Sequence, residues 1–191
     1  MPTSTPKRRA DAERNIETIL RATHELMAHG TLPSMSDVAT ASGIGRVTLY
    51  SHFPSREVLL EEVLRRGIEH TDQVLTELAL DEQPPAEALV RLVQKSWPIL
   101  DRHRRVRTIA LAEIGPETLR RQHDAAFQHV GRLIERGRAA GDFRTDQPVD
   151  WLVATFYAIL HAAADEVDAG RLASADAPDL LISTLLSTLR R

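Results

Sequence analysis

The sequence contains no cysteine, which excludes disulfide bonds, thiolate metal sites and cysteine nucleophiles. Aromatic residues make up only 4% of the chain, and runs of β-branched residues are few, so a β-sheet is not expected. The chain also lacks an apolar run of the roughly 18 residues that a membrane-spanning helix needs. Its first nine residues are polar and have no apolar core of a signal peptide. We therefore expect a cytoplasmic protein without a membrane partner.

What the sequence does contain is typical of a helical protein. Ala, Leu, Glu and Arg dominate its 191 residues, of which 42% are hydrophobic, and these residue types favour helices. The length is sufficient for one well-filled domain or for two small domains that share helices. The composition therefore predicts an all-α fold.

The charge is distributed unevenly along the chain. Residues 1–56 carry a formal charge of +2 and the remainder carries −5, within a net charge of −3. Because phosphate contact requires basic groups on one face rather than a basic protein, the acidic remainder does not exclude nucleic-acid binding. Lys7, Arg8 and Arg9 are expected to form a flexible arm, which either contacts phosphates or is simply solvated.

The stretch from Ser34 to Phe53 has the pattern of a helix-turn-helix. Ser34 and Asp37 have the spacing of a capping box, in which each side chain bonds a backbone amide at the start of a helix. Gly43 can adopt the left-handed conformation that ends that helix. A second short helix, over about 45–52, then presents polar side chains. Two short helices, a glycine turn and a polar second helix are the parts of a major-groove reader.

The same stretch resembles a known family. The run Thr48, Leu49, Tyr50, followed by His52 and Phe53 and then by the sequence Pro-Ser-Arg-Glu, is similar to the N-terminal signature of the TetR family of one-component transcription regulators. The resemblance covers about residues 9–63. It implies an N-terminal three-helix DNA-binding head, residues 1–56, and a helical ligand-binding and dimerisation body, residues 57–191.

The residues expected to contact double-stranded operator DNA lie on the second short helix and just after it. Arg46 and Ser51 are the candidates for base edges, because a guanidinium fork suits guanine and Ser51 occupies a variable position. Tyr50, His52 and Thr48 are candidates for phosphates, and Arg56 begins the next helix, where free amides favour anions. The sequence departs from the family pattern at Gly45, Arg46 and Val47. These departures affect which operator sequence is recognised and not how the helix docks on DNA. The predicted contacts are Arg46, Val47, Thr48, Tyr50, Ser51, His52 and Arg56.

Apolar periodicity and helix breakers predict the remaining elements. Pro98, Gly115, Gly141 and Gly170 are expected to end helices. The predicted helices outside the motif are 10–29, 56–80, 86–100, 104–114, 117–140, 149–169 and 179–189.

Catalysis and metal binding are not indicated. The eight histidines show no His-Glu-x-x-His spacing, and no nucleophile can be matched to a base from spacing. We therefore expect neither an enzyme nor a metal or cofactor site.

Several large or polar residues stand on otherwise apolar helices of the body. A pocket for a small organic ligand needs apolar walls with a few placed polar groups, and the family resemblance implies such a pocket. Each residue alone has the simpler interpretation of an ordinary core or surface position. The predicted ligand-binding set is Trp97, Arg107, His123, Phe127, Tyr157 and His161.

The last two predicted helices are apolar around more of their circumference than one buried face requires. Small alanines among large residues permit close helix approach, so pairing of two subunits into a four-helix bundle is expected, and the resemblance implies the same homodimer. The predicted interface residues are Trp151, Thr155, Ile159, Ala162, Ile182, Leu185 and Leu189.

Together these patterns predict a ligand-responsive transcriptional regulator, in particular a repressor released from its operator by a small organic ligand. The alternative is a helical small-molecule-binding or enzymatic protein that retains the head only as a scaffold. Salt-dependent DNA binding separates the two.

Overall fold

The computed structural model describes residues 5–115, 118 and 123–190. All the regular elements of these residues are helices, so the predicted all-α class is confirmed. The chain divides into two compact units: Met1–Gly67 with Arg105–Leu119, and Ile68–Arg104 with Arg120–Arg191. The two long helices α4 (Arg56–Glu77) and α5 (Pro85–Ile114) each contribute residues to both units.

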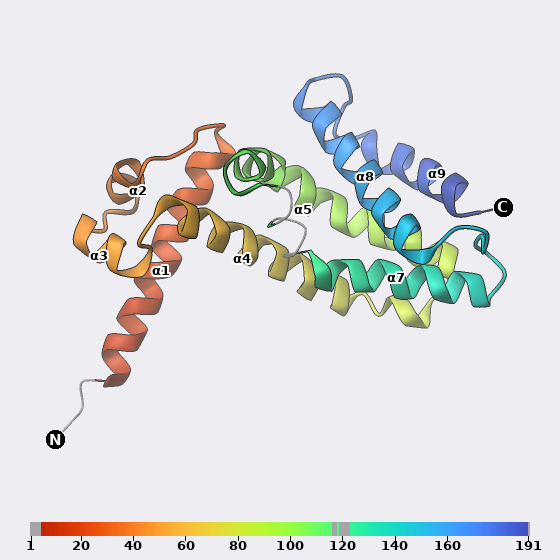
Figure 1. Cartoon of the computed structure of the whole chain (residues 1–191), viewed down its shortest axis with the longest axis horizontal. Coiled ribbons are helices and arrows are strands. Elements are labelled where there is room, and N and C mark those ends of the chain that lie inside the picture. Colours follow the sequence, from red (N-terminus) through yellow and green to blue (C-terminus); the bar gives the residue numbers. More distant parts are fainter. Residues whose placement is uncertain (1–4, 116–117, 119–122, 191) are drawn as a thin grey trace. The chain divides into compact units, whose positions relative to one another are not determined.

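The first unit begins with three helices, α1 (Thr5–Ala28), α2 (Met35–Ser42) and α3 (Arg46–His52), followed by the first part of α4 (Figure 1). α1 starts five residues earlier than predicted. The backbone of Lys7–Arg9 is therefore helical, and the prediction of a flexible arm at these residues is wrong. The buried side chains that hold the unit together include Ile19, Met27, Val38, Leu49, Leu59 and Leu60.

Local chemistry explains the helix-turn-helix geometry. The Asp37 amide donates to Ser34 Oγ over 3.2 Å and the Ser34 amide donates to Asp37 Oδ2 over 2.9 Å, which completes the predicted capping box. Gly43 ends α2 with φ of 68°, a left-handed conformation that costs glycine little. Gly45 precedes α3 and has no side chain with which to cap it.

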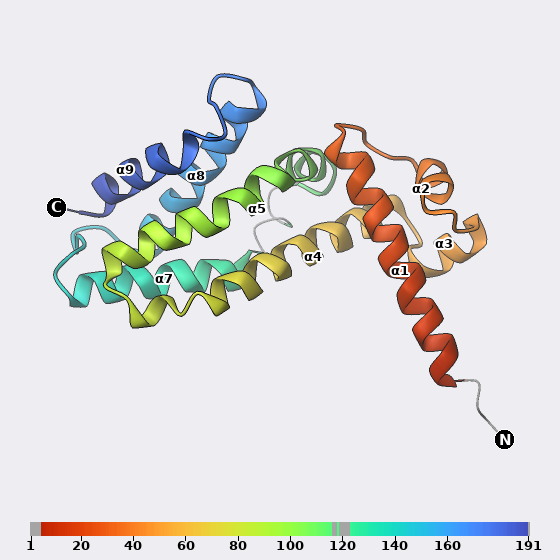
Figure 2. The same cartoon turned by 180° about the vertical axis from the view of Figure 1, so that it is seen from behind.

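The second unit has one continuous hydrophobic core. It is formed by the second part of α4, the short 3-10 helix η1 (Leu80–Glu82), the first part of α5, α7 (Asp124–Ala139), α8 (Val149–Asp168) and α9 (Ala177–Leu189). Figures 1 and 2 show α8 and α9 side by side. Fully buried side chains of this core include Leu89, Leu92, Leu133, Ile134, Leu152 and Leu185.

α5 corrects a prediction. Pro98 was expected to separate two helices, but α5 continues through it from Pro85 to Ile114. A proline inside a helix removes one hydrogen bond and strains the preceding turn, at about 3 kcal/mol. The ring of Pro98 is exposed, whereas Val93 and Trp97 on the preceding turn are buried. Burial of that inner face offsets the local cost, because each fully buried large apolar side chain contributes about 1.5–3 kcal/mol.

Other predicted bounds differ less. α4 ends at Glu77 rather than near Leu80, and α8 and α9 agree with prediction within two residues. The predicted helix 117–140 corresponds to α7 from Asp124 onward, while residues 117 and 119–122 lie outside the described part. Within the described residues, every helix is either too short or too polar to cross a membrane.

Candidate functional site

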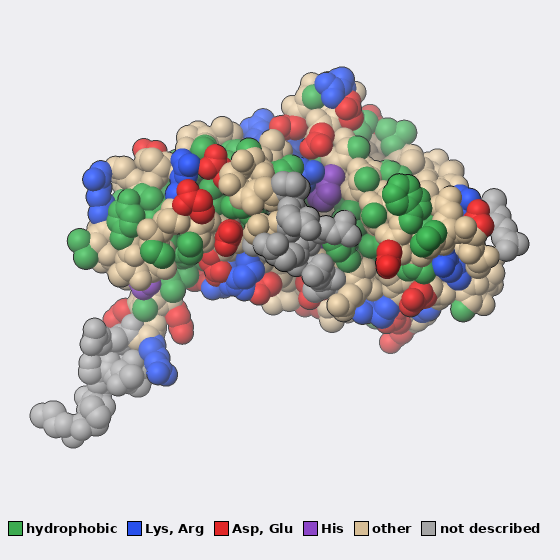
Figure 3. All heavy atoms as spheres, viewed as in Figure 1, with side chains coloured by type: hydrophobic (Ala, Val, Ile, Leu, Met, Phe, Trp, Pro, Cys, Tyr) green, Lys and Arg blue, Asp and Glu red, His purple; other side chains and the backbone are tan. Residues whose placement is uncertain are grey.

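One side of α3 faces away from the rest of its unit. Arg46, Val47, Tyr50 and Ser51 are exposed, and Val47 and Tyr50 have exposed fractions of 87% and 49%. With about 100° of rotation per residue, these four positions share one arc of the helix. Leu49 is fully buried on the opposite side. Figure 3 shows hydrophobic and basic side chains together at the surface over α2 and α3.

Two hydrogen bonds restrict side chains on this exposed arc. Arg46 Nη2 donates to the hydroxyl oxygen of Ser36 on α2, which holds the guanidinium near the first turn of α3. Ser51 Oγ donates to the carbonyl oxygen of Thr48 over 2.7 Å. Because its proton is used within the helix, Ser51 Oγ offers lone pairs to an incoming group. The other two predicted contacts on α3, Thr48 and His52, are half-buried.

Arg56 has a partner that sequence reasoning missed. Its Nη2 lies 2.7 Å from Glu113 Oε2, and both side chains are partly exposed. The two residues belong to the same unit but are 57 positions apart, so spacing gives no signal for the pair. The ion pair links α4 to α5 within the first unit and counters the positive charge of Arg56.

Four of the six predicted ligand-binding residues come together in the second unit. The rings of Phe127 and Tyr157 meet edge to face with centroids 4.3 Å apart. His123, at the N-terminal cap of α7, has its ring centroid 6.0 Å from Phe127 and 6.0 Å from His161. His161 lies 6.2 Å from Tyr157. We call His123, Phe127, Tyr157 and His161 the ring cluster.

A charged side chain that was not predicted, Asp72, acts electrostatically on Tyr157 of the ring cluster. Asp72 on α4 accepts from His129 Nε2 across 2.9 Å, and His129 Nδ1 lies 2.9 Å from Arg132 Nη2. Burial raises the pKa of the Tyr157 phenol well above its ordinary value, and the negative charge of Asp72 raises it further. The phenol therefore remains a neutral hydrogen-bond donor throughout the physiological pH range.

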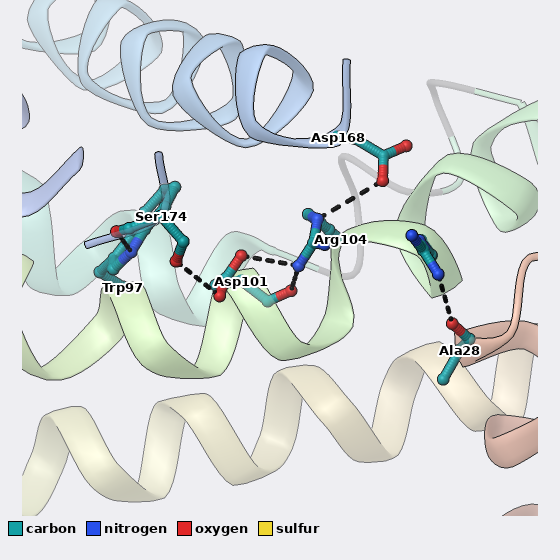
Figure 4. A network of polar contacts seen from close by, with 7 residues as sticks. Ala28, Trp97, Asp101, Arg104, Asp168 and Ser174 are labelled. Carbon is teal, nitrogen blue, oxygen red and sulfur yellow. Dashed lines mark hydrogen bonds and ion pairs between the residues drawn. The ribbon is translucent and has the colours of Figure 1, made fainter. Parts of the chain in front are cut away.

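The remaining two predicted ligand-binding residues, Trp97 and Arg107, are not members of the ring cluster. Trp97 is 3% exposed, and its Nε1 donates to the carbonyl oxygen of Ser174 over 3.0 Å (Figure 4). Ser174 Oγ in turn donates to Asp101 Oδ2 over 2.7 Å. Trp97 is thus a core residue whose polar atom is already satisfied by the α8–α9 loop. Arg107 belongs to the first unit.

An open groove of about 430 Å³ lies between α7 and α8. Phe127 lines it together with Gly131, Val153 and Ala154, so it borders one ring of the ring cluster. Charged side chains at its edges are Arg132, Glu135 and Asp150. Among the described residues, no group of three or more His, Asp or Glu side chains is placed to hold a metal ion.

The predicted dimer residues divide between two faces of α8 and α9. Trp151 is 60% exposed, Ala162 is exposed, and Thr155, Ile159 and Ile182 are half-buried. Leu185 and Leu189 were predicted to face a partner, but they are 1% and 2% exposed and pack in the core of their own unit. The prediction is wrong for Leu185 and Leu189 because α9 is apolar on both sides. Helical periodicity alone then does not identify the side that faces the core. Figure 3 shows hydrophobic side chains at the surface along α8.

Comparison with known proteins supports this arrangement. Residues 19–63 match the model of bacterial regulatory proteins, tetR family, which spans the end of α1, both helices of the motif and the start of α4. An HTH-type transcriptional regulator of Staphylococcus aureus is 33% identical over 50% of this chain, and the match spans only 46% of that relative. The repressor LfrR of Mycolicibacterium smegmatis is 26% identical over 78% of this chain and 77% of its own length.

Solved structures share the fold over nearly the whole chain. LfrR from Mycobacterium smegmatis, in complex with proflavine, has a TM-score of 0.72 at 20% identity and covers 94% of this chain and 98% of its own. FadR from Bacillus subtilis, in complex with stearoyl-CoA, has a TM-score of 0.79 at 14% identity, with 91% and 99% covered.

The exposed arc of α3 and the helical fold define the class as helix-turn-helix proteins with a helical body. Within that class, residues 19–63 match the tetR family of bacterial regulatory proteins, and the chain is similar to regulators of that family.

Proposed function

We propose that the protein is a DNA-binding repressor that a small organic ligand releases from its operator. The observation that carries this proposal is the exposed arc of α3, with Arg46, Val47, Tyr50 and Ser51 side by side within residues that match the family model. Such a helix fits the major groove, where side chains reach base edges and flanking phosphates. Residues 1–56 are the DNA-binding part of this proposal, and residues 57–191 bind ligand and form the homodimer.

The DNA contacts that we propose follow from the side chains of this arc. Arg46 reads guanine, Ser51 accepts a hydrogen bond from a base amino group, and Tyr50, Thr48 and His52 contact phosphates. Arg56 is bound to Glu113, so we propose that it positions α4 against α5 and makes no direct phosphate contact.

The ligand site that we propose is the ring cluster, with the groove beside Phe127 as its entrance. Four rings that meet edge to face or stacked favour a planar aromatic ligand, because aromatic pairs gain about 0.5–1.5 kcal/mol beyond area burial. The neutral Tyr157 phenol and the two imidazoles supply polar contacts. The relative LfrR in complex with proflavine supports this ligand class. Trp97 and Arg107 are left out of the site, since Trp97 is a satisfied core residue.

The homodimer that we propose uses the outer stripe of α8, which carries Trp151, Thr155, Ala158 and Ala162 at spacings of three and four. Small residues at three of these positions permit close helix approach. A symmetric pair holds two recognition helices a fixed distance apart, so a ligand that changes this distance lowers DNA affinity. To shift the dimer from almost fully competent for DNA binding to almost fully incompetent, the ligand must bind the incompetent state about 10⁴-fold more tightly.

Fluorescence anisotropy with a labelled duplex from the DNA immediately upstream of the gene tests the proposal. We expect specific binding that weakens as salt increases, and dissociation of the complex when proflavine is added. His123→Ala should raise the proflavine concentration needed for release, while His70→Ala, a substitution of an exposed histidine on α4, should not. If the protein does not bind this DNA specifically, the alternative of a small-molecule-binding protein with an unused head gains support. If it binds but neither variant changes release, the ligand site lies elsewhere.

A further inference from the structure

Val47 is exposed to an unusual degree for an aliphatic residue. Its exposed fraction of 87% is the highest of the exposed large hydrophobic side chains in the described chain. Valine is also a poorer helix former than alanine, because its branched side chain loses rotamer freedom. At this position in a seven-residue helix, valine therefore contributes neither to the core nor to helix stability.

The position of Val47 on α3 points to a contact outside the chain. Arg46, Tyr50 and Ser51 share the exposed arc, and with about 100° per residue Val47 stands between Tyr50 and Ser51 near its middle. Leu49 anchors the opposite side of the helix at 0% exposure. In a helix, a valine side chain strongly prefers one χ1 rotamer, so its two methyl groups are presented in a fixed direction.

The chemistry of the major groove offers one apolar group that such a side chain can recognise. Base edges there present hydrogen-bond donors and acceptors, except that thymine also presents its C5-methyl group. Arg46, immediately before Val47, carries the positive charge that suits DNA rather than an apolar protein surface. We propose that Val47 contacts the C5-methyl group of a thymine in the operator and so selects thymine at that position. This inference rests on the proposed DNA-binding function.

Replacement of single thymines by deoxyuridine tests the contact, because it removes only the methyl group. In the upstream duplex that the protein binds specifically, each thymine of one half-site is replaced in turn and affinity is measured at one salt concentration. Removal of one buried methyl group should weaken binding about fourfold at one thymine. Val47→Ala should bind the thymine duplex about as weakly as the parent protein binds the deoxyuridine duplex, and should no longer distinguish the two.

Val58→Ala is the matched control, since Val58 is a second exposed valine in the same unit but lies on α4. It should remain as sensitive to the deoxyuridine replacement as the parent. If the parent binds its operator specifically but no deoxyuridine replacement weakens binding, the thymine contact is wrong while the DNA-binding function stands. If Val47→Ala keeps the parental sensitivity, another residue reads the methyl group and the inference is also wrong. If no specific DNA binding occurs at all, the proposed function itself fails.

Discussion

Two glycines of α7 differ sharply in their surroundings. A Cβ atom at Gly137 would lie 2.0 Å from Cδ2 of Phe143, a ring that is 2% exposed. A Cβ atom at Gly131 would have Val153 Cγ2 as its nearest neighbour, at an ordinary contact distance of 3.8 Å. The close approach of Phe143 to the backbone of α7 therefore requires glycine at position 137 but not at position 131.

We expect the two alanine substitutions to have opposite effects on stability. Gly137→Ala should lower the free energy of unfolding by about 1–3 kcal/mol, because a buried ring cannot move aside without disturbing the core. Gly131→Ala should raise it by about 0.5–1 kcal/mol, since alanine is the better helix former and meets no clash. Urea denaturation followed by circular dichroism measures both. Equal stabilisation by the two substitutions would show that Phe143 does not pack against Gly137 as described.

At the scale of a single element, the start of α2 depends on a charged cap. Ser34 Oγ donates to Asp37 Oδ2 over 2.7 Å, and the Ser34 amide donates to the same oxygen. The side-chain hydrogen bond from Ser34 is the main reason that the pKa of Asp37 is lowered, and the backbone hydrogen bond adds to it. The ionised form of Asp37 therefore stabilises the capping box at the start of the helix-turn-helix.

This coupling predicts a pH dependence. Because the pKa of Asp37 is lower in the folded state, its contribution to stability is complete above the unfolded value of about 3.9 and is lost as the pH falls through the folded value. Ser34→Ala should move the pKa of Asp37 upward, toward its ordinary value, as measured by NMR titration of the carboxyl carbon. Ser42→Ala, at the other end of α2, should leave it in place. An unchanged pKa in Ser34→Ala would mean that the capping box does not form in solution.

At the scale of the whole molecule, α8 and α9 each have a buried inner face and a more exposed outer face. Leu181, Leu185 and Leu189 follow one another at spacings of four and are all buried in the core of the second unit. Trp151 on α8 and Leu180 on α9 are instead 60% and 54% exposed. The outer face remains available to a second copy of the chain, as proposed above.

Two glutamate substitutions separate these faces. Trp151→Glu should give a folded monomer that binds operator weakly, because the avidity of two joined heads is lost. Leu185→Glu should instead unfold the second unit, since it places a charge in an apolar core. Sedimentation and circular dichroism together distinguish the two outcomes, and Leu32→Glu, at a site 37% exposed in the first unit, serves as a control that stays dimeric. A Trp151→Glu protein that remains dimeric at micromolar concentration would place the interface elsewhere.

Local signals in the sequence were enough to determine the helix-turn-helix. Ser34 and Asp37 lie three positions apart and form the capping box, and Gly43 ends α2 in a left-handed conformation. Each of these features depends on neighbours within about one helical turn, where propensity and capping act. The all-α class follows from the same local preferences.

The tertiary structure alone decided the contacts between distant residues. Trp97 and Ser174 are 77 positions apart, and Arg56 and Glu113 are 57 positions apart, so no spacing rule connects them. It also decided that Pro98 stays inside α5, because burial of the neighbouring turn outweighs a local penalty. Helical periodicity shows which residues share a face, but where both faces are apolar, as around Leu185, only the packing of the other helices selects the one that turns inward.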